Sequence, residues 1–328
     1  MAVRGPGYLF GMLTPKARGS LSERLFEALR ARPDDLADLV DVAPESIDDE
    51  QIALWALYEL HHHGFEDVDD ALEWDPHLLA LRPRLEAAFE RRLRARWTPP
   101  GRSHDADTFA DDFFAFVEGH DGASLATHVQ RTADAEQVLD LFRWRSVYHL
   151  KESDSTAWAV PRLRPRTKAA LVELLYDEYG TGDPARLHAH LFARGLDACG
   201  LSPEYGAYVD DAPLEILEQN NAMTLFGLHR RLRGAALGHL AAFEVTSSLP
   251  SRRMSQGIAR LGLAPEMAHY YDEHVEADAV HEQLAVRNIC GGLLAEEPHL
   301  SDDVWFGAWC CLDLEDRVAR MVLAEWAA

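Results

Sequence analysis

Apolar side chains recur every three or four positions along most of this chain, which is the spacing of amphipathic helices. Ala, Leu, Glu and Arg are frequent and favour helix, whereas no long alternating run of Val, Ile, Thr or Tyr predicts a strand. The pair Asp121-Gly122 lacks the alternating flanks of a hairpin. The pattern therefore predicts an all-α protein.

Three helices are predicted in the first hundred residues. Residues 20–23, Ser-Leu-Ser-Glu, have the form of a capping box and open the first helix. An apolar-periodic run at 52–60 predicts the second helix. The third is expected at 83–97, with Pro83 in its first turn and Leu78 in a short turn before it.

The clearest helix breaker is the segment 97–102, Trp-Thr-Pro-Pro-Gly-Arg, and we place a boundary there. Residues 1–98 are then a helical N-terminal extension, and residues 102–328 a bundle of about seven helices. The helices expected after the breaker lie at 106–118, 122–131, 134–147, 165–179, 184–199, 213–227, 229–247, 252–262, 264–296 with breaks, and 301–325.

The net charge limits the kinds of molecule that the protein is expected to bind. Asp and Glu number 55 against 32 for Lys and Arg, which gives a net charge of −23. Such an acidic surface disfavours binding to nucleic acid and to anionic membranes. No apolar run approaches the roughly 18–20 residues of a membrane span, and the N-terminus lacks the layout of a signal peptide. With no CxxC pair among the four cysteines, we expect free thiols and a cytoplasmic protein.

The most informative histidines lie in the segment 269–281. His274, Asp278 and His281 are spaced by four and three residues, so their side chains share one stripe of a helix. Two imidazoles and a carboxylate on one stripe suit iron, manganese or zinc. Apolar neighbours indicate a buried helix; an exposed acidic helix is the alternative.

Other helices must supply the remaining ligands. Glu244 follows a small and apolar segment, 237–243, which carries its carboxylate inward. A buried carboxylate needs a metal, a cation or a proton, so a structural ion pair is an equal alternative. Glu178 and His188 flank a predicted joint between two helices, around Gly180-Thr181-Gly182. These glycines follow a helix and lack the Lys-Ser/Thr of a phosphate loop.

These motifs together resemble the haem-oxygenase-like diiron oxidases and oxygenases, often described as iron-containing redox enzymes. The resemblance covers residues 102–328 and includes the order of the motifs and the thirty residues between Glu244 and His274. Glu178 and His188 are ten residues apart, whereas some members have a spacing of seven. Glu173 and Asp177 are therefore rival ligands.

The resemblance implies a haem-oxygenase-like bundle that binds two irons rather than haem, with manganese as an alternative metal. Its carboxylates, expected to be the catalytic residues, are Glu178, Glu244 and Asp278, and its imidazoles are His188, His274 and His281. It further implies that O2 is a co-substrate, that an external electron donor is needed, and that a small organic substrate is oxidised. An amino-acid-like or other carboxylate-bearing substrate is the favoured class.

Three side chains are candidates for contacting this substrate. Lys151 precedes the first ligand helix, Arg252 lies soon after Glu244, and Tyr271 lies beside the ligand stripe. A guanidinium holds a carboxylate through two hydrogen bonds. Surface or core packing is the alternative for each.

Rival interpretations remain. A ferritin-like diiron bundle needs two Glu-x-x-His motifs, and residues 59–62 and 266–269 match that pattern. The side chains of the run His61-His62-His63 point in different directions on a helix, so they cannot converge on one ion. A metal-free, small-molecule-binding member of the same fold is the main functional alternative. A purely structural or regulatory helical protein has no positive support.

Two further expectations concern the helices themselves. The helix that carries His274 and Asp278 should be the weakest element of the metal-free protein, because several polar ligands face inward there. The N-terminal extension serves either to form a homodimer or to cover the substrate pocket.

Overall fold

The structure is a computed structural model that describes residues 11–31, 36–99 and 108–327, apart from the side chains of residue 37 and of residues 276–279. Within these ranges the chain is helical, with no strand. The all-α prediction is confirmed, and the helices of the described residues form a bundle, as the resemblance implies. No helix of the described part is long and apolar enough to cross a membrane.

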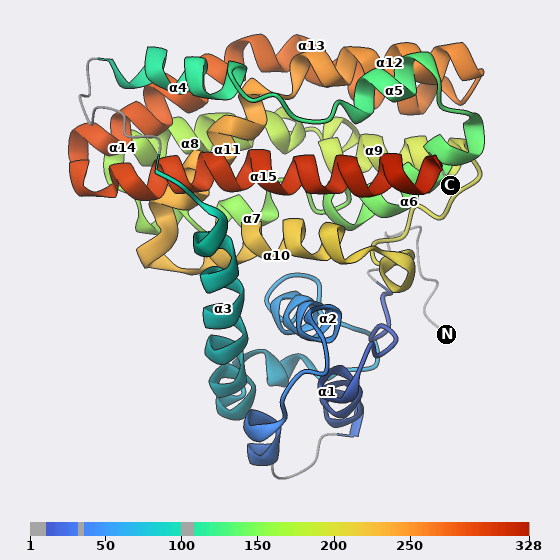
Figure 1. The fold of residues 1–328 in the computed structure, drawn as a ribbon, viewed down its shortest axis with the longest axis vertical. Helices are drawn as coiled ribbons and strands as arrows, with labels where there is room; N and C mark the ends of the chain where they lie inside the picture. Colours follow the sequence, from blue (N-terminus) through green and yellow to red (C-terminus); the bar gives the residue numbers. More distant parts are fainter. Residues whose placement is uncertain (1–10, 32–35, 100–107, 328) are drawn as a thin grey trace.

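The N-terminal part contributes α1 (Ser20–Ala31), α2 (Ile47–Glu59) and α3 (Pro76–Arg96). In Figure 1 these three helices, blue to teal, lie to one side of the bundle, with α2 nearest to α10 (Leu214–Leu228). α2 packs against α10, and the amide of Asn221 donates two hydrogen bonds to Gln51 across this contact. α3 ends just before the predicted boundary; the division into extension and bundle stays a prediction.

The predicted start of the third helix was wrong. α3 begins at Pro76, and Asp75 caps it by accepting hydrogen bonds from the backbone N–H groups of His77 and Leu78. Pro76 is therefore the first-turn proline, while Pro83 lies inside the helix. Leu78, expected in a turn, is a buried helical residue.

The bundle contains the other α-helices of the described chain. They are α4 (Phe109–Glu118), α5 (Leu125–Arg131), α6 (Ala135–His149), α7 (Asp154–Ala157), α8 (Pro165–Glu178), α9 (His188–Ala198), α10, α11 (Arg233–Val245), α12 (Ser248–Leu261), α13 (Pro265–Gln283), α14 (Gly291–Glu296) and α15 (Ser301–Trp326). A π-helical turn, Leu284–Cys290, joins α13 to α14, which is one of the breaks expected within 264–296. Figure 1 shows α15 running the length of the bundle.

The tightest helix pair is α11 with α15. A Cβ on Gly238 would lie 1.9 Å from the carbonyl oxygen of Val304, and one on Gly307 would lie 2.0 Å from that of Ala235. Glycine at both positions lets the two backbones touch, as any larger side chain would separate them. This contact fixes α11, and with it Glu244, relative to α15.

Candidate metal centre

Glu178 and His188 lie at the two ends of the predicted helix joint. Glu178 is the last residue of α8 and His188 is the first residue of α9. The chain reverses between them through three consecutive residues with positive φ, Gly180, Thr181 and Gly182. A Cβ on Gly180 would lie 2.6 Å from the backbone nitrogen of Leu187, so only glycine permits this close return.

The carboxylate of Glu178 lies between two imidazoles. Its Oε2 is 3.1 Å from Nδ1 of His188, and its Oε1 is 3.5 Å from Nδ1 of His281. The hydroxyl of Ser153 donates a hydrogen bond to Oε2. With one oxygen toward each histidine, Glu178 has the placement of a bridging carboxylate.

On one side of Glu178, the side chains of α11 and α13 complete a buried group of three. Glu244 and His281 lie with Glu178 such that one potential ligand atom from each is within 4.8 Å of the others. Nδ1 of His281 is 3.6 Å from Oε2 of Glu244. The other ring nitrogen, Nε2, lies 3.2 Å from the carboxylate of Asp177. Asp177 therefore orients His281, which is the supporting contact a metal-bound imidazole requires.

On the other side, Glu152, His188 and His274 form a second buried group of three within the same 4.8 Å limit. Nε2 of His274 is 3.6 Å from Oε1 of Glu152, and the rings of His188 and His274 are 4.6 Å apart at their centroids. Nδ1 of His274 lies 2.8 Å from the carbonyl oxygen of Tyr270. That contact places a ring proton on Nδ1 and directs Nε2 toward Glu152.

Glu152 was not among the ligands proposed from the sequence. It follows the end of α6 at His149, within a turn whose next residue, Ser153, has φ of 71°. Helical periodicity gives no direction for a side chain in such a turn. The available signal was the spacing from His149 to Glu152, three residues, directly before a buried helix.

The structure does not bring every predicted residue to this centre. Asp278 lies in the part of α13 whose side chains are outside the described residues. Of the rival ligands, Glu173 is exposed, and Asp177 faces the outer nitrogen of His281.

The three side chains predicted to contact the substrate lie in different parts of the structure. Lys151 is buried and paired with Glu59 of α2 rather than with the candidate ligands. Arg252 is exposed on α12. Tyr271 is buried and lines a cavity beside the centre.

The ferritin-like motifs lie elsewhere. Glu59 forms an ion pair with Lys151, and Nδ1 of His62 donates a hydrogen bond to the carbonyl oxygen of Tyr58. Glu266 and His269 are both exposed. These residues do not converge with one another in the described structure.

Burial and neighbouring charges shift the pKa of several of the six grouped side chains. Burial lowers the pKa of His281, but the nearby carboxylate of Glu244 and the charge of Glu178 outweigh it and raise that pKa to about 9. Burial raises the pKa of Glu244. Burial also raises the pKa of Glu152, but the charge of His274 outweighs it and holds this pKa well below its usual range. Without metal, protonated imidazoles supply the positive charge that the carboxylates need.

The donor atoms fit divalent metal. Nδ1 of His188 and Nδ1 of His281 are buried and lack a hydrogen-bond partner, although carboxylate oxygens lie 3.1 Å and 3.5 Å away. Such orphaned nitrogens are rare in folded proteins unless a ligand satisfies them. Three buried carboxylates and three buried imidazoles in two groups suit a pair of iron or manganese ions.

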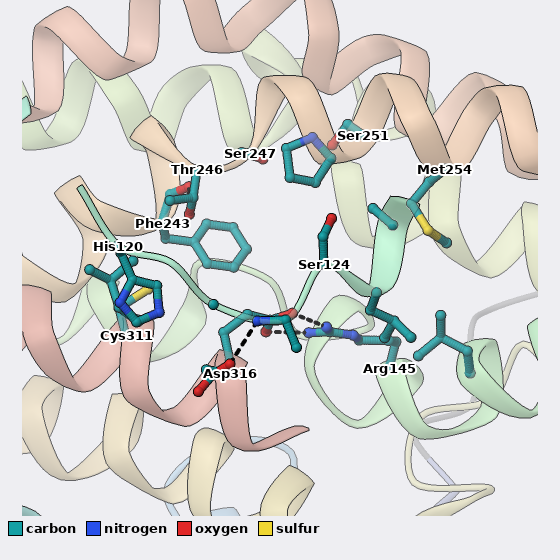
Figure 2. Close-up of a pocket in the computed structure, with 18 of the residues that line it drawn as sticks. His120, Ser124, Arg145, Phe243, Thr246, Ser247, Ser251, Met254, Cys311 and Asp316 are labelled. Atoms are coloured by element: carbon teal, nitrogen blue, oxygen red, sulfur yellow. Dashed lines mark hydrogen bonds and ion pairs between the residues drawn. The ribbon is translucent and has the colours of Figure 1, made fainter. Parts of the chain in front are cut away.

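A cavity of about 310 Å³ lies beside the centre. His149 belongs to its lining, and Nδ1 of His149 also lies 2.7 Å from the hydroxyl oxygen of Tyr270, which donates to Glu152. Figure 2 shows the cavity between Phe243, Thr246 and Ser247 on one side and Arg145 and Asp316 on the other. The cavity is not lined by any of the six candidate ligands; it adjoins them through His149, which lies 3.6 Å from Glu152, and through Phe243, the residue before Glu244.

Comparison with known families adds an independent result. A family model described as iron-containing redox enzyme matches residues 139–316. This span contains every candidate ligand of the two groups and most of the cavity lining. No curated protein matches the chain.

Proposed function

The chain belongs to the iron-containing redox enzyme family, and from this premise we propose that it is a non-haem diiron oxidase or oxygenase that uses O2 to oxidise a small organic substrate. The observation that carries the proposal is the position of Glu178, with one carboxylate oxygen toward each of the two buried groups. A single-metal site would not need a carboxylate shared in this way.

Each metal would be held by one group of side chains. Glu152, His188 and His274 would hold the first ion, and Glu244 and His281 the second, with Glu178 shared between them. Two ferrous ions at this position supply the electrons that O2 needs in order to react with an organic substrate.

The protein's own residues prepare the centre for this chemistry. The Tyr270 carbonyl keeps the proton of His274 on Nδ1, and Asp177 holds His281 in place. The ring of Tyr148 lies 5.6 Å from that of Phe243, the residue before Glu244. Burial raises the pKa of Tyr148 well above its usual range, so its hydroxyl stays protonated. These contacts orient the ligands and keep bulk water away.

We infer that the reaction also needs an external electron donor, because ferrous ions that have given electrons to O2 must be reduced again before the next turnover. The proposed compartment is the cytoplasm, where the four free cysteines stay reduced. Manganese is the alternative metal.

Anaerobic titration of metal-stripped protein with Fe(II) tests the proposal. We expect about two irons per chain, and rapid loss of ferrous iron when the loaded protein is mixed with O2. Glu244→Ala and His281→Ala should each reduce the bound iron, whereas Glu173→Ala, an exposed change on α8, should not. Iron binding that is absent, or unaffected by the first two changes, would leave a metal-free small-molecule-binding bundle as the better interpretation.

A further inference from the structure

Two consecutive tyrosines connect a candidate ligand with the cavity. Tyr270 and Tyr271 lie side by side in the sequence of α13, and both are buried. The hydroxyl of Tyr270 donates a hydrogen bond of 3.0 Å to Oε2 of Glu152, a candidate ligand. Tyr271, in contrast, lines the cavity. One tyrosine therefore contacts the metal centre, and the next one contacts the space beside it.

Tyr270 is enclosed by aromatic rings that belong to both sides. Its ring centroid lies 4.6 Å from that of His274, another candidate ligand, and 5.1 Å from that of Tyr271. His149, which lines the cavity, has its ring 5.3 Å away and its Nδ1 2.7 Å from the hydroxyl oxygen of Tyr270. Because Tyr270 is only 1% exposed, bulk water is kept from its ring and hydroxyl.

The separation of the cavity from the ligands makes a connection of this kind necessary. In the described structure none of the six candidate ligands lines the cavity, so a molecule in it does not touch the side chains that would hold the metals. Oxidation of that molecule therefore requires an electron to cross the intervening wall. A phenol whose proton can leave gives up an electron far more readily than the imidazole of His149 or the phenyl ring of Phe243.

We propose that Tyr270 is a redox-active residue, which is oxidised to a phenoxyl radical when the ferrous protein reacts with O2 and is returned to the phenol by a molecule in the cavity. This inference rests on the proposed function, because the iron and O2 are the oxidant. Tyr270 is then the carrier of single electrons between the cavity and the metal centre.

Electrons and protons balance in both steps. In the first step, Tyr270 gives one electron to the centre and its hydroxyl proton to Oε2 of Glu152, which is within hydrogen-bond reach. Reduction of O2 to two waters takes four electrons and four protons. Two electrons come from the ferrous ions, one from Tyr270 and one from the external donor, and the protons come from solvent. In the second step, the radical takes one electron from the cavity molecule and regains its proton from Glu152.

His149 stabilises the radical at the same oxygen atom. Since the hydroxyl proton of Tyr270 is directed to Glu152, Nδ1 of His149 is the donor in the contact of 2.7 Å. This hydrogen bond persists when the hydroxyl proton has left, and in a buried site it is stronger than in water. The radical is therefore hydrogen-bonded, and its hydrogen bond contains an exchangeable proton.

The alternative is that Tyr270 only orients Glu152 through their hydrogen bond. Removal of the hydroxyl would then weaken iron binding, but the unaltered protein would form no radical. A spectroscopic signature of the tyrosine itself therefore separates the two interpretations, whereas a loss of activity does not.

Freeze-quench electron paramagnetic resonance provides the test. Metal-stripped protein receives about three equivalents of Fe(II) per chain without oxygen, two for the centre and one as the electron donor. It is then mixed with O2 in the absence of substrate and frozen at increasing times. We expect a free-radical signal that narrows when the chain contains ring-deuterated tyrosine. The signal should also change in D2O, because the hydrogen bond from His149 exchanges.

Two variants assign the radical to one residue. Tyr270→Phe removes a single hydroxyl, so we expect iron to bind while the radical signal is lost. Tyr58→Phe is the matched control, because Tyr58 is equally buried and donates its hydroxyl to a carboxylate, that of Glu86, within the N-terminal helices. This control should retain both the iron and the radical.

The inference is overturned if the unaltered protein binds iron and oxidises it with O2 without forming a tyrosine radical, or if the radical persists in Tyr270→Phe. Either result leaves the diiron function intact. A protein that takes up no iron refutes the diiron function, and this inference with it. Iron content measured on every sample therefore distinguishes the two failures.

Discussion

At the scale of single residues, Glu152 is the candidate ligand that the sequence did not predict. It is buried, and its carboxylate faces His274 while accepting a hydrogen bond from Tyr270. We expect Glu152→Gln to reduce bound iron from about two per chain to about one, because the amide is a weaker ligand than a carboxylate. Iron content measured per chain checks this.

Glu136→Gln is the matched control for that change, since Glu136 is exposed at the start of α6, the helix that precedes Glu152. Unaltered iron content in Glu152→Gln would show that Glu152 is a structural partner of His274 and not a ligand.

The resemblance implied that Glu178, Glu244 and His281 are neighbours, and each lies on a regular helix or at its end. Helical spacing then gives the face on which each side chain lies. Glu152 lies beyond the end of α6, before a residue with positive φ, where spacing carries no directional information. The partner of Lys151 could not be predicted either, because Glu59 is 92 residues away and on a different helix.

At the scale of elements, the turn after α6 connects the N-terminal helices to the metal centre. Lys151 pairs with Glu59 of α2, Glu152 faces His274, and Ser153 donates to Glu178. Three consecutive residues therefore contact the extension and both groups of candidate ligands. The two roles expected for the extension, forming a homodimer or covering the pocket, stay predictions. The pair of Lys151 with Glu59 indicates a further role, which is to anchor the turn that carries Glu152.

Breaking the Lys151–Glu59 pair tests this coupling. Glu59→Leu leaves a buried, unpaired ammonium group, and we expect it to lower the free energy of unfolding by about 3–5 kcal/mol. It should also weaken Fe(II) binding, because the turn that carries Glu152 loses its anchor. Denaturant unfolding and Fe(II) titration measure the two effects.

The double variant Glu59→Leu with Lys151→Met provides the control, since replacing a whole buried pair by apolar side chains is often close to neutral for stability. Full recovery of both stability and iron affinity would be consistent with the coupling. Normal iron affinity in the single variant would contradict it.

The helix α13 is the second element with a predicted behaviour. It is helical from Pro265 to Gln283, and its carboxyl end passes into the π-helical turn Leu284–Cys290. His274 and His281 face inward toward other polar groups, and Val280 between them is exposed. We expect its amides to exchange hydrogen faster than those of α11 without metal, and to become protected when Fe(II) binds.

Hydrogen exchange followed by mass spectrometry measures this difference. The helix α15 is the internal reference, because its glycine contact with α11 does not involve the centre. Equal protection of α13 with and without Fe(II) would contradict the expectation.

At the scale of the whole molecule, apolar periodicity was sufficient for the all-α fold, but helix boundaries depended on local capping. α3 begins at Pro76, capped by Asp75, about two helical turns before the start that Pro83 suggested. The contact of α11 with α15 could not be predicted, because it depends on Gly238 and Gly307 meeting backbone atoms of a helix far away in the sequence.

The stability of the metal-free protein should depend on pH through His281. Its pKa is about 9 in the folded chain against 6.5 for an ordinary histidine, so the stabilising proton is present in full below pH 6.5. As pH rises from 6.5 to about 9, the unfolded chain has released this proton and the folded chain still holds it, so stability falls. The slope is at most about 1.4 kcal/mol per pH unit.

Thermal unfolding of the metal-stripped protein between pH 6 and pH 9.5 measures this fall, with His281→Gln as the comparison. The variant should show a shallower decline over the same interval. Identical pH profiles would exclude His281 as the group responsible.

The central claim is that two metal ions lie on either side of Glu178. A crystal structure of the Fe(II)-loaded protein, with anomalous diffraction collected at the iron edge, tests it most directly. The account predicts two iron peaks about 3.5–4 Å apart, one beside Glu152, His188 and His274 and the other beside Glu244 and His281, with the Glu178 carboxylate between them. A single peak, or iron away from these residues, would contradict it.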